Sequence, residues 1–191
     1  QILSSNVKSY SLYANSIRIK NKSELSKKIS DIININSEII LKKLKSNKKF
    51  VYLKRNISPK EHQKIIELGE INLQTELVKK RVYPFKNISS HIVGHVNIDN
   101  VGMAGIEKGY EEDLKLGQNK YLTIDINLQN AVRNELVSII DKFSAKSGSV
   151  IIMDIQSSEL LTFINYPDFD PNNFNESTSE QRLNRILQSN Y

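Results

Sequence analysis

The sequence predicts an α+β fold in which helices pack on small twisted antiparallel sheets. Strands are indicated by a two-residue side-chain period in residues 7–14 and 71–82. Helices are indicated where apolar residues recur every three or four positions behind a serine that can cap the first turn. A chain of 191 residues, 39% hydrophobic and 25% charged, is long enough to bury a core of this kind.

The first elements are a strand and two helices. Residues 7–14 alternate two sets of side chains that both contain apolar or aromatic members, which favours a strand. Ser23 is expected to cap a helix that runs to about Asn34, and Ser37 to cap a second helix. The apolar stripes predicted to face inward are Leu25, Ile29, Ile32 and Ile33 on the first helix, and Ile39, Ile40 and Leu44 on the second.

A strand, a helix and another strand follow. Residues 50–53 read as a strand that leads into Lys54 and Arg55. Ser58-Pro59-Lys60-Glu61 is a well-formed helix start, with Ser at the cap, Pro in the first turn and Glu where a capping box needs it. This helix should end at Gly69, and residues 71–82 should be extended.

Residues 81–110 hold four of the seven glycines and two of the three histidines. Pro84 pushes Tyr83 into an extended conformation, so the strand should stop there. Ser89 and Ser90 can cap a short helix in which Gly94 marks a close backbone approach. Gly102 and Gly105 precede a second amphipathic segment, 106–114, with Glu107 in its first turn, where a carboxylate favours the helix dipole. We predict a buried ion pair between Arg81 and Glu107.

The second half is expected to contain a strand, a helix and a hairpin. Residues 121–125 read as a strand, and Asp125 or Asn127 should cap the helix that follows. The expected inward stripe of that helix is Leu128, Val132, Leu136, Ile139, Ile140 and Phe143. Residues 148–155 form a β-branched run typical of a buried strand, and 156–159 turn it into a partner strand that Pro167 stops.

Composition excludes several classes. Zero cysteines exclude a disulfide framework and a thiolate metal site, and no apolar run reaches the length of a membrane span. The net charge of +6 fits an anionic partner, but the lysines are scattered among apolar residues, which favours a solvated face. No nucleic-acid recognition motif is visible, so a cytosolic nucleic-acid-associated protein is the weakest alternative and we expect no nucleic-acid partner.

Short patterns of catalytic or metal-binding type occur in the chain. Ser5-Asn6-Val7-Lys8 and Ser46-Asn47-Lys48-Lys49 fit Ser-x-x-Lys, Ser4-Ser5-Asn6 fits Ser-x-Asn, and Lys146-Ser147-Gly148 fits a variant of Lys-Thr-Gly. In a chain rich in Ser and Lys we interpret them as coincidences. His62 belongs to a capped surface helix. His91 and His95 have zinc-ligand spacing but lack a Glu base, so a structural role is favoured and no metal or cofactor is predicted.

The order of three signatures resembles the pedestal module of class B penicillin-binding proteins. These are Arg81-x-Tyr83-Pro84, His91-x-x-Gly94 and Gly102-x-x-Gly105-Ile106-Glu107-Lys108. Gln1-Ile2-Leu3 resembles the tail of that family's opening signature, and residues 121–129 resemble the Leu-Thr-Ile-Asp-x-x-Leu-Gln that opens its transpeptidase domain. Relatives usually carry Gly at the position of Ser158 and Ala at that of Thr162. A Pro-Asn loop matches at Pro171-Asn172, and Asn184-Arg185 and Tyr191 resemble the residues just before the acylated Ser.

The resemblance implies a pedestal, or dimerisation, domain at residues 1–116 and the first part of a transpeptidase domain at 117–191, without its nucleophile, which is expected beyond Tyr191. The parent would be a division-type D,D-transpeptidase on the periplasmic face of the bacterial inner membrane, anchored by a helix upstream of Gln1. Implied partners are other division or cell-wall synthesis proteins, with a possible homodimer. The alternative is a stand-alone secreted or surface binding module, or scaffold, with a basic face.

Overall fold

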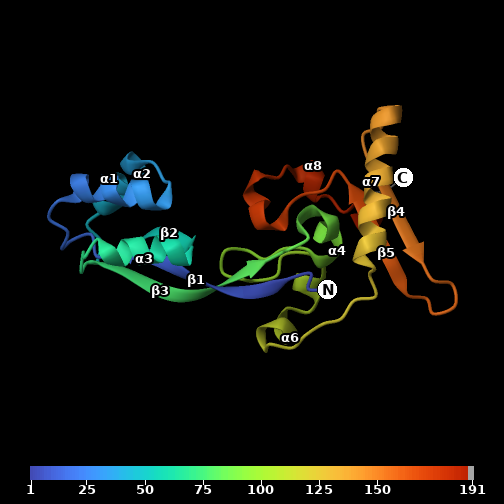
Figure 1. The fold of residues 1–191 in the computed structure, drawn as a ribbon, viewed down its shortest axis with the longest axis horizontal. Coiled ribbons are helices and arrows are strands. Elements are labelled where there is room, and N and C mark those ends of the chain that lie inside the picture. The colour runs from blue at the N-terminus through green and yellow to red at the C-terminus, as the bar shows by residue number, and fades with distance from the viewer. Residues whose placement is uncertain (189–191) are drawn as a thin grey trace. The chain divides into compact units, whose positions relative to one another are not determined.

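The computed structural model describes residues 1–188 (Figure 1). The elements in chain order are β1 (Ser5–Ala14), α1 (Lys22–Ile33), α2 (Ser37–Leu44), β2 (Val51–Ile57), α3 (Pro59–Glu67), β3 (Leu73–Val82), η1 (Lys86–Ser89), α4 (Ser90–Val93), α5 (Gly105–Gly109), α6 (Glu111–Lys115), α7 (Ile126–Phe143), β4 (Gly148–Met153), β5 (Leu160–Tyr166), η2 (Pro171–Glu176), α8 (Ser179–Arg182) and α9 (Arg185–Gln188). Helices and small antiparallel sheets confirm the predicted α+β class. None of the helices in residues 1–188 is long and apolar enough to cross a bilayer.

The chain divides into two compact units. Unit 1 consists of Gln1–Ser5 together with the chain from Arg81 onward, and unit 2 is the continuous segment Asn6–Lys80. Unit 2 is built on a three-stranded sheet of order β2-β1-β3, with β1 and β2 antiparallel and two irregularities in their register. Its core residues are Leu12, Ala14, Ile19, Leu25, Ile29, Ile33, Ile40, Leu44, Leu53, Ile57, Ile65 and Leu73.

The helices of unit 2 form where the sequence predicts them, with two caps displaced. The capping box of α3 is present, because Ser58 accepts from the Glu61 amide and Glu61 accepts from the Ser58 amide. The caps of α1 and α2 are Asn21 and Asn36, one or two residues before the predicted serines. Asparagine caps a helix as well as serine does, so the earlier residue ends the extended chain first.

The predicted inward stripe of α2 is wrong at one position. Ile40 and Leu44 are fully buried, whereas Ile39 is 52% exposed. Residues four apart share one face of a helix, and Ile39 is rotated about 100° from Ile40. The apolar side chain of Ile39 therefore faces solvent.

Unit 1 contains the antiparallel hairpin β4-β5, covered on one face by α7. A Cβ on Gly148 would meet the side chains of Leu136 and Ile140 of α7 at 2.8 Å and 3.0 Å, which identifies the covered face. The helix is capped by Asp125, whose carboxylate accepts from the amides of Asn127 and Leu128. The hairpin turn predicted at 156–159 is present, with Ser158 at a positive φ of 62°.

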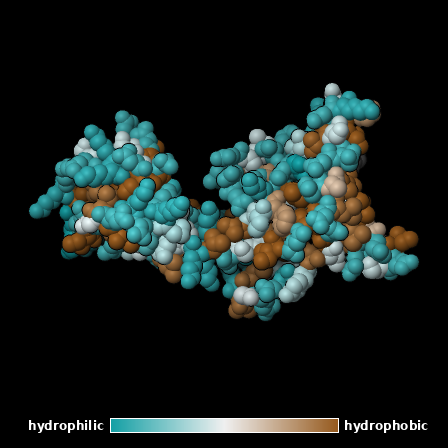
Figure 2. Space-filling model, in the orientation of Figure 1, coloured by the Kyte–Doolittle hydropathy of each residue, from teal (hydrophilic) through white to brown (hydrophobic). Residues whose placement is uncertain are grey.

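Four expectations for unit 1 are wrong. The β4 strand is not buried: Ile151 and Met153 are 51% and 54% exposed, because they point away from α7. Ile139 and Phe143 of α7 are also exposed, because they lie on a face of the helix that no neighbouring element in residues 1–188 covers. Figure 2 shows this apolar surface over α7 and the hairpin. Residues 121–125 form no strand, since only Thr123 and Asp125 bond to the β5 backbone. The segment 106–114 is two short helices, α5 and α6, rather than one.

Candidate functional site

The predicted ion pair between Arg81 and Glu107 is present in unit 1. Arg81, near the end of β3, donates from Nε to Glu107 Oε1 at 2.8 Å. The two side chains are 13% and 4% exposed, so the pair is largely withdrawn from water. A second nitrogen of the same guanidinium group, Nη2, donates to the Ser4 hydroxyl at 2.7 Å. One arginine thus ties the first residues of the chain to the end of β3 and to α5.

Tyr83 lies beside this pair and is 3% exposed. Its hydroxyl accepts a hydrogen bond from the Val96 amide at 3.1 Å. Burial, followed by the charge of the Glu107 carboxylate, raises the pKa of the Tyr83 hydroxyl well above its ordinary value, so the group stays protonated. Pro84 follows directly after Tyr83, and β3 ends at Val82 as predicted.

The three glycines of the motif lie where two backbone segments cross. A Cβ on Gly94 would stand 1.9 Å from the carbonyl oxygen of Ala104, and Gly94 has a φ of +80°. A Cβ on Gly102 would stand 2.1 Å from the carbonyl oxygen of Glu107. Gly105 meets the Ile92 carbonyl oxygen in the same way, at 2.5 Å. Side chains at these positions would push α4 and α5 apart and would displace Glu107.

The two histidines of the motif belong to an aromatic cluster. His95 stacks on Phe174 with ring centroids 3.9 Å apart, and both histidines meet the ring of Phe169 edge-on. His91 also lies 3.4 Å from the carbonyl oxygen of Pro167 through Nε2. Burial lowers the pKa of each imidazole, and Arg182 lowers that of His95 further. Their neutral forms are therefore favoured at pH 7.

The other candidates are distributed over separate elements. No group of three or more His, Cys, Asp or Glu in residues 1–188 is placed to hold a metal ion. His62 lies on α3 in unit 2, stacked on Tyr10 and 2.9 Å from the Thr75 hydroxyl. Ser5 begins β1, and Ser46 follows the end of α2. Neither serine starts a helix that would bring a lysine one turn later to its hydroxyl.

Two residues with amide side chains, which the sequence analysis did not propose as site residues, join elements of the site. Asn172 in η2 accepts from the Tyr83 amide at 3.0 Å and donates to the Tyr83 carbonyl at 2.9 Å. Gln129 in α7 is fully buried, accepts from the Phe163 amide and donates to the Ile88 carbonyl. Both residues belong to segments that resemble the family, and this resemblance was the signal in the sequence that could have pointed to them.

An ion pair that the sequence did not indicate lies between α7 and the loop after β5. Arg133 donates to both carboxylate oxygens of Asp168, with Nη2 3.1 Å from Oδ1. Asn87 donates to the same carboxylate at 3.2 Å. The two groups are 35 residues apart in sequence, so no local pattern connects them. The site as a whole is a buried polar framework that fixes the elements of unit 1 to one another.

The fold is that of penicillin-binding proteins. It is shared with the crystal structure of penicillin-binding protein 2X from Streptococcus thermophilus at a TM-score of 0.61 and 15% identity, over 95% of this chain and 35% of that one. A peptidoglycan synthetase from Bifidobacterium adolescentis has a TM-score of 0.52 at 16% identity, over 94% of this chain and 42% of that one. Within this class the chain belongs to the penicillin-binding protein dimerisation domain family, whose model matches residues 1–153.

Two similar relatives are named as peptidoglycan D,D-transpeptidases, which confirms the resemblance found in the sequence. The chain is 27% identical to the probable enzyme PenA of Neisseria meningitidis over 190 residues, covering 84% of this chain and 33% of the relative. It is 27% identical to FtsI of Escherichia coli K12 over 191 residues, covering 84% and 32%. The chain therefore spans about a third of the length of these relatives.

Proposed function

We propose that this chain is the non-catalytic front portion of a peptidoglycan D,D-transpeptidase, which positions a catalytic domain during cell-wall synthesis and cell division. Residues 1–116 are assigned to the pedestal and 117–191 to the start of the transpeptidase domain. The observation that carries the proposal is the buried Arg81–Glu107 pair with its bond to Ser4, inside a chain that belongs to the dimerisation family. Such a framework gives a rigid support rather than a reaction centre.

The serine chemistry of the whole enzyme is assigned to another part of the longer protein. Acyl transfer of this type needs a Ser with a Lys one helical turn later, facing a second Ser and a Lys-Thr-Gly strand. Ser5 and Lys8 lie three residues apart in β1, so their side chains point to opposite faces of the sheet. Ser46 lies in the turn after α2, away from any helix start.

Labelling with a fluorescent penicillin tests this assignment. The 191-residue chain should take up no covalent label, and peptide mapping that finds acylated Ser5 or Ser46 would contradict the proposal. The coding sequence beyond Tyr191 is a second test. A Gly-Ser-x-x-Lys within about ten residues supports the transpeptidase parent. A native chain that ends at Tyr191 would favour the stand-alone binding or scaffold module.

The proposed location is the periplasmic face of the bacterial inner membrane, with the parent anchored by a helix upstream of Gln1. Proposed partners are other division or cell-wall synthesis proteins. The names of the two relatives described above, both peptidoglycan D,D-transpeptidases, support this setting. Crosslinking of the tagged parent in the cell, with and without the Arg81→Ala change, tests whether the support is needed to meet those partners.

We also propose that the chain self-associates through the exposed face of the hairpin. Ile151, Met153 and Ile155 are 51%, 54% and 91% exposed on one hairpin, a cluster of apolar surface that a second copy can cover. Light scattering of the purified chain at high concentration should show dimers. The double change Ile151→Thr and Met153→Thr should restore monomers.

Ile98 and Met103 provide a matched control for this experiment. They are 62% and 49% exposed in the same unit but lie outside the hairpin. Changing both to threonine removes the same two residue types and should leave the dimer fraction unchanged. A sharply monomeric wild-type chain, or equal effects of the two double variants, would contradict association through the hairpin.

A further inference from the structure

The net charge of +6 is distributed unevenly between the two units. Unit 2 holds 17 of the 27 basic residues and 7 of the 21 acidic residues, a net charge of +10. The rest of the chain holds 10 basic and 14 acidic residues, a net charge of −4. Hydrophilic residues cover the outer side of α1 and α2 in Figure 2. The excess positive charge of the protein is therefore a property of unit 2 alone.

Three loops of unit 2 meet at one end of its sheet. They are residues 15–21 after β1, 45–50 before β2 and 69–72 before β3, and we call them together the basic tip. The Lys48 amide donates to the Ser16 hydroxyl at 2.8 Å, and the Ser16 amide donates to the Lys48 carbonyl at 3.0 Å. The Asn15 amide donates to the Asn72 carbonyl at 2.9 Å. These bonds hold the loops side by side.

The basic tip gathers cations that the sequence scatters. Its exposed basic residues are Arg18, Lys20, Lys45, Lys48 and Lys49. Lys22 is half-buried and donates to the Asn47 side chain at 2.8 Å. Glu70 is the acidic residue of these loops, and its carboxylate accepts from the amide and the side chain of Asn72. Two ion pairs of unit 2, Lys28 with Glu24 and Lys54 with Glu61, lie outside the basic tip.

Each loop of the basic tip also exposes one large apolar side chain. Ile17 is 53% exposed, Phe50 is 47% exposed and Ile71 is 87% exposed. An isolated exposed apolar residue needs no explanation, but here three come from three loops held together by hydrogen bonds. The combination of apolar side chains with surrounding lysines is the one that binds at the boundary between lipid headgroups and acyl chains.

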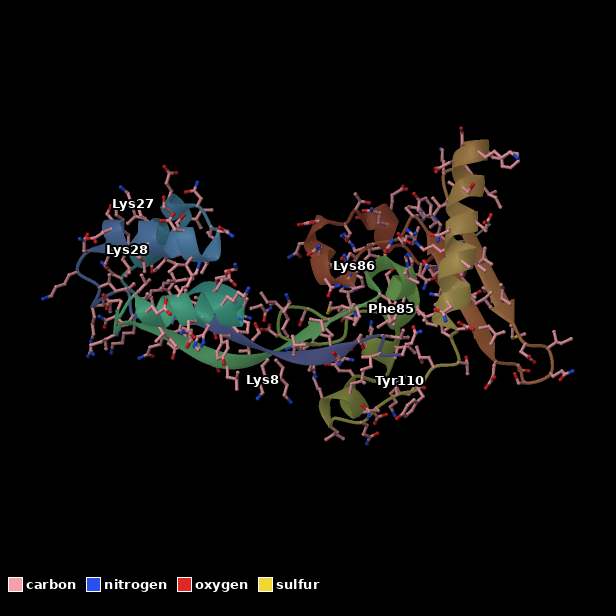
Figure 3. The ribbon with its side chains drawn as sticks, in the orientation of Figure 1. Lys8, Lys27, Lys28, Phe85, Lys86 and Tyr110 are labelled. Atoms are coloured by element: carbon pink, nitrogen blue, oxygen red, sulfur yellow. The ribbon has the colours of Figure 1, made fainter. Side chains whose placement is uncertain are left out.

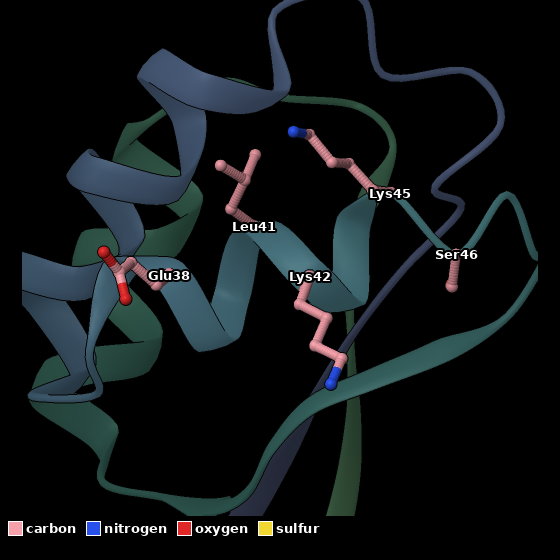
Figure 4. A pocket seen from close by; sticks show the side chains of 5 residues that line it. All are labelled: Glu38, Leu41, Lys42, Lys45 and Ser46. Carbon is pink, nitrogen blue, oxygen red and sulfur yellow. The ribbon is translucent and has the colours of Figure 1, made fainter.

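A hollow beside α2 extends the cationic surface (Figure 4). It has a volume of about 490 Å³ and is lined by Glu38, Leu41, Lys42, Lys45 and Ser46. Lys42 extends from α2 and Lys45 from the position that caps its C-terminus, and in Figure 4 the Lys45 side chain points toward the side of Leu41. The hollow is open to solvent, so it suits a surface that lies against it better than an enclosed small molecule.

We propose that the basic tip binds the surface of an anionic phospholipid membrane, with its lysines on the headgroups and Ile17, Phe50 and Ile71 inserted between them. A soluble polyanion would use the cations but gain nothing from the apolar side chains. An extended peptide would need a groove, whereas these residues stand on neighbouring loop ends. The proposal depends on unit 2 alone and holds independently of the proposed transpeptidase function.

Co-sedimentation of the 191-residue chain with vesicles tests the proposal. Vesicles of phosphatidylcholine with one quarter phosphatidylglycerol should bind the chain, and pure phosphatidylcholine vesicles should not. Binding should weaken steeply with salt, because screening shortens the reach of the surface potential. The triple change Lys20→Glu, Lys48→Glu and Lys49→Glu should lower the partition coefficient at least about 100-fold, since each lysine near such a surface contributes severalfold.

A charge-matched control separates the basic tip from net charge. Lys8 (labelled in Figure 3), Lys60 and Lys64 are exposed residues of unit 2 outside the basic tip, and reversing all three changes the net charge equally. This variant should keep most of the binding. Equal losses in the two triple variants would overturn the proposal, as would a wild-type chain that does not bind anionic vesicles. Circular dichroism of every variant excludes unfolding as the cause.

The apolar residues provide the test of the partner's class. Ile17→Ser with Ile71→Ser should weaken vesicle binding about tenfold while leaving binding to soluble polyphosphate unchanged. These two residues are exposed, so the changes should not disturb the core. If vesicle binding is unaffected by the double change and polyphosphate binds as tightly as vesicles do, the partner is an anionic polymer and the membrane assignment is wrong.

Discussion

Replacing Arg81 with alanine leaves the carboxylate of Glu107 without its partner in a site where only 4% of that side chain is exposed. Removing one member of a buried pair costs about 3–5 kcal/mol, because the remaining charge has been taken out of water. The lost hydrogen bond to Ser4 adds about 1 kcal/mol. We therefore expect Arg81→Ala to lower the free energy of unfolding of unit 1 by at least about 4 kcal/mol.

The measurement must report on unit 1 rather than on the whole chain. The Val96 amide, which donates to the Tyr83 hydroxyl next to the pair, is a suitable hydrogen-exchange probe. Its protection should fall by about three orders of magnitude in Arg81→Ala, since each 1.4 kcal/mol is a factor of ten when exchange follows unfolding of the unit. Amides in the core of unit 2, such as that of Leu53, provide the internal reference and should change little.

Two further variants separate the ion pair from its surroundings. Ser4→Ala removes only the secondary contact and should cost about 1 kcal/mol. The double variant Arg81→Met with Glu107→Leu replaces the pair with apolar side chains of similar length and should recover more than half of the loss. A loss below about 1 kcal/mol in Arg81→Ala, or no recovery in the double variant, would refute the account of an orphaned buried charge.

Three other outcomes follow from the same framework. Gly94→Ala should abolish folding of unit 1 or lower its free energy of unfolding in urea by more than about 3 kcal/mol, because the added Cβ has no room. The control variant Gly109→Ala should be nearly neutral, because the space around Gly109 is open. Burial lowers the pKa of His95 below its unfolded value, so the stability linked to this group is present above about pH 6.5 and is lost as pH falls through the folded-state pKa. The variant His95→Phe keeps the stack on Phe174 but cannot be protonated. It should therefore flatten the decline of Tm between pH 7.5 and 5. Ser158→Gly should raise stability in thermal unfolding by about 1 kcal/mol, because Ser158 has a positive φ, and a lower Tm would contradict that reading.

Local signals in the sequence predicted those features that depend on neighbouring residues. The capping box at Ser58 and Glu61, the end of β3 before Pro84 and the hairpin turn at Ser158 all form as expected. The ion pair of Arg81 with Glu107 was predicted across 26 residues, because both belong to motifs that occur in one order. Hydrogen-bond chemistry within a few residues decides such features, and it is visible in the sequence.

The features that were missed depend on what each element contacts. The β-branched run of β4 predicts burial on both faces, but α7 covers only one of them, so Ile151 and Met153 are exposed. Residues 121–125 have strand-forming side chains but make too few bonds to β5 for a ladder. The two hydrogen bonds between the Asn172 side chain and the Tyr83 backbone join residues that are 89 positions apart. A single amide side chain produces no periodic pattern in the sequence from which such a contact could be predicted.

The discontinuity of unit 1 has a consequence for synthesis and evolution. Unit 2 is one continuous segment, inserted between residues 5 and 81 of unit 1. While the chain emerges from the ribosome, unit 2 can fold before Ser4 forms its hydrogen bond with Arg81, which lies 77 residues later in the sequence. Folding of unit 2 pairs β1 with β3, so it brings Ser4 close to Arg81 and removes most of the chain entropy that closing a free loop of that length would cost. An inserted segment of this kind can also carry a surface charge of its own, here +10, without altering the framework into which it is inserted.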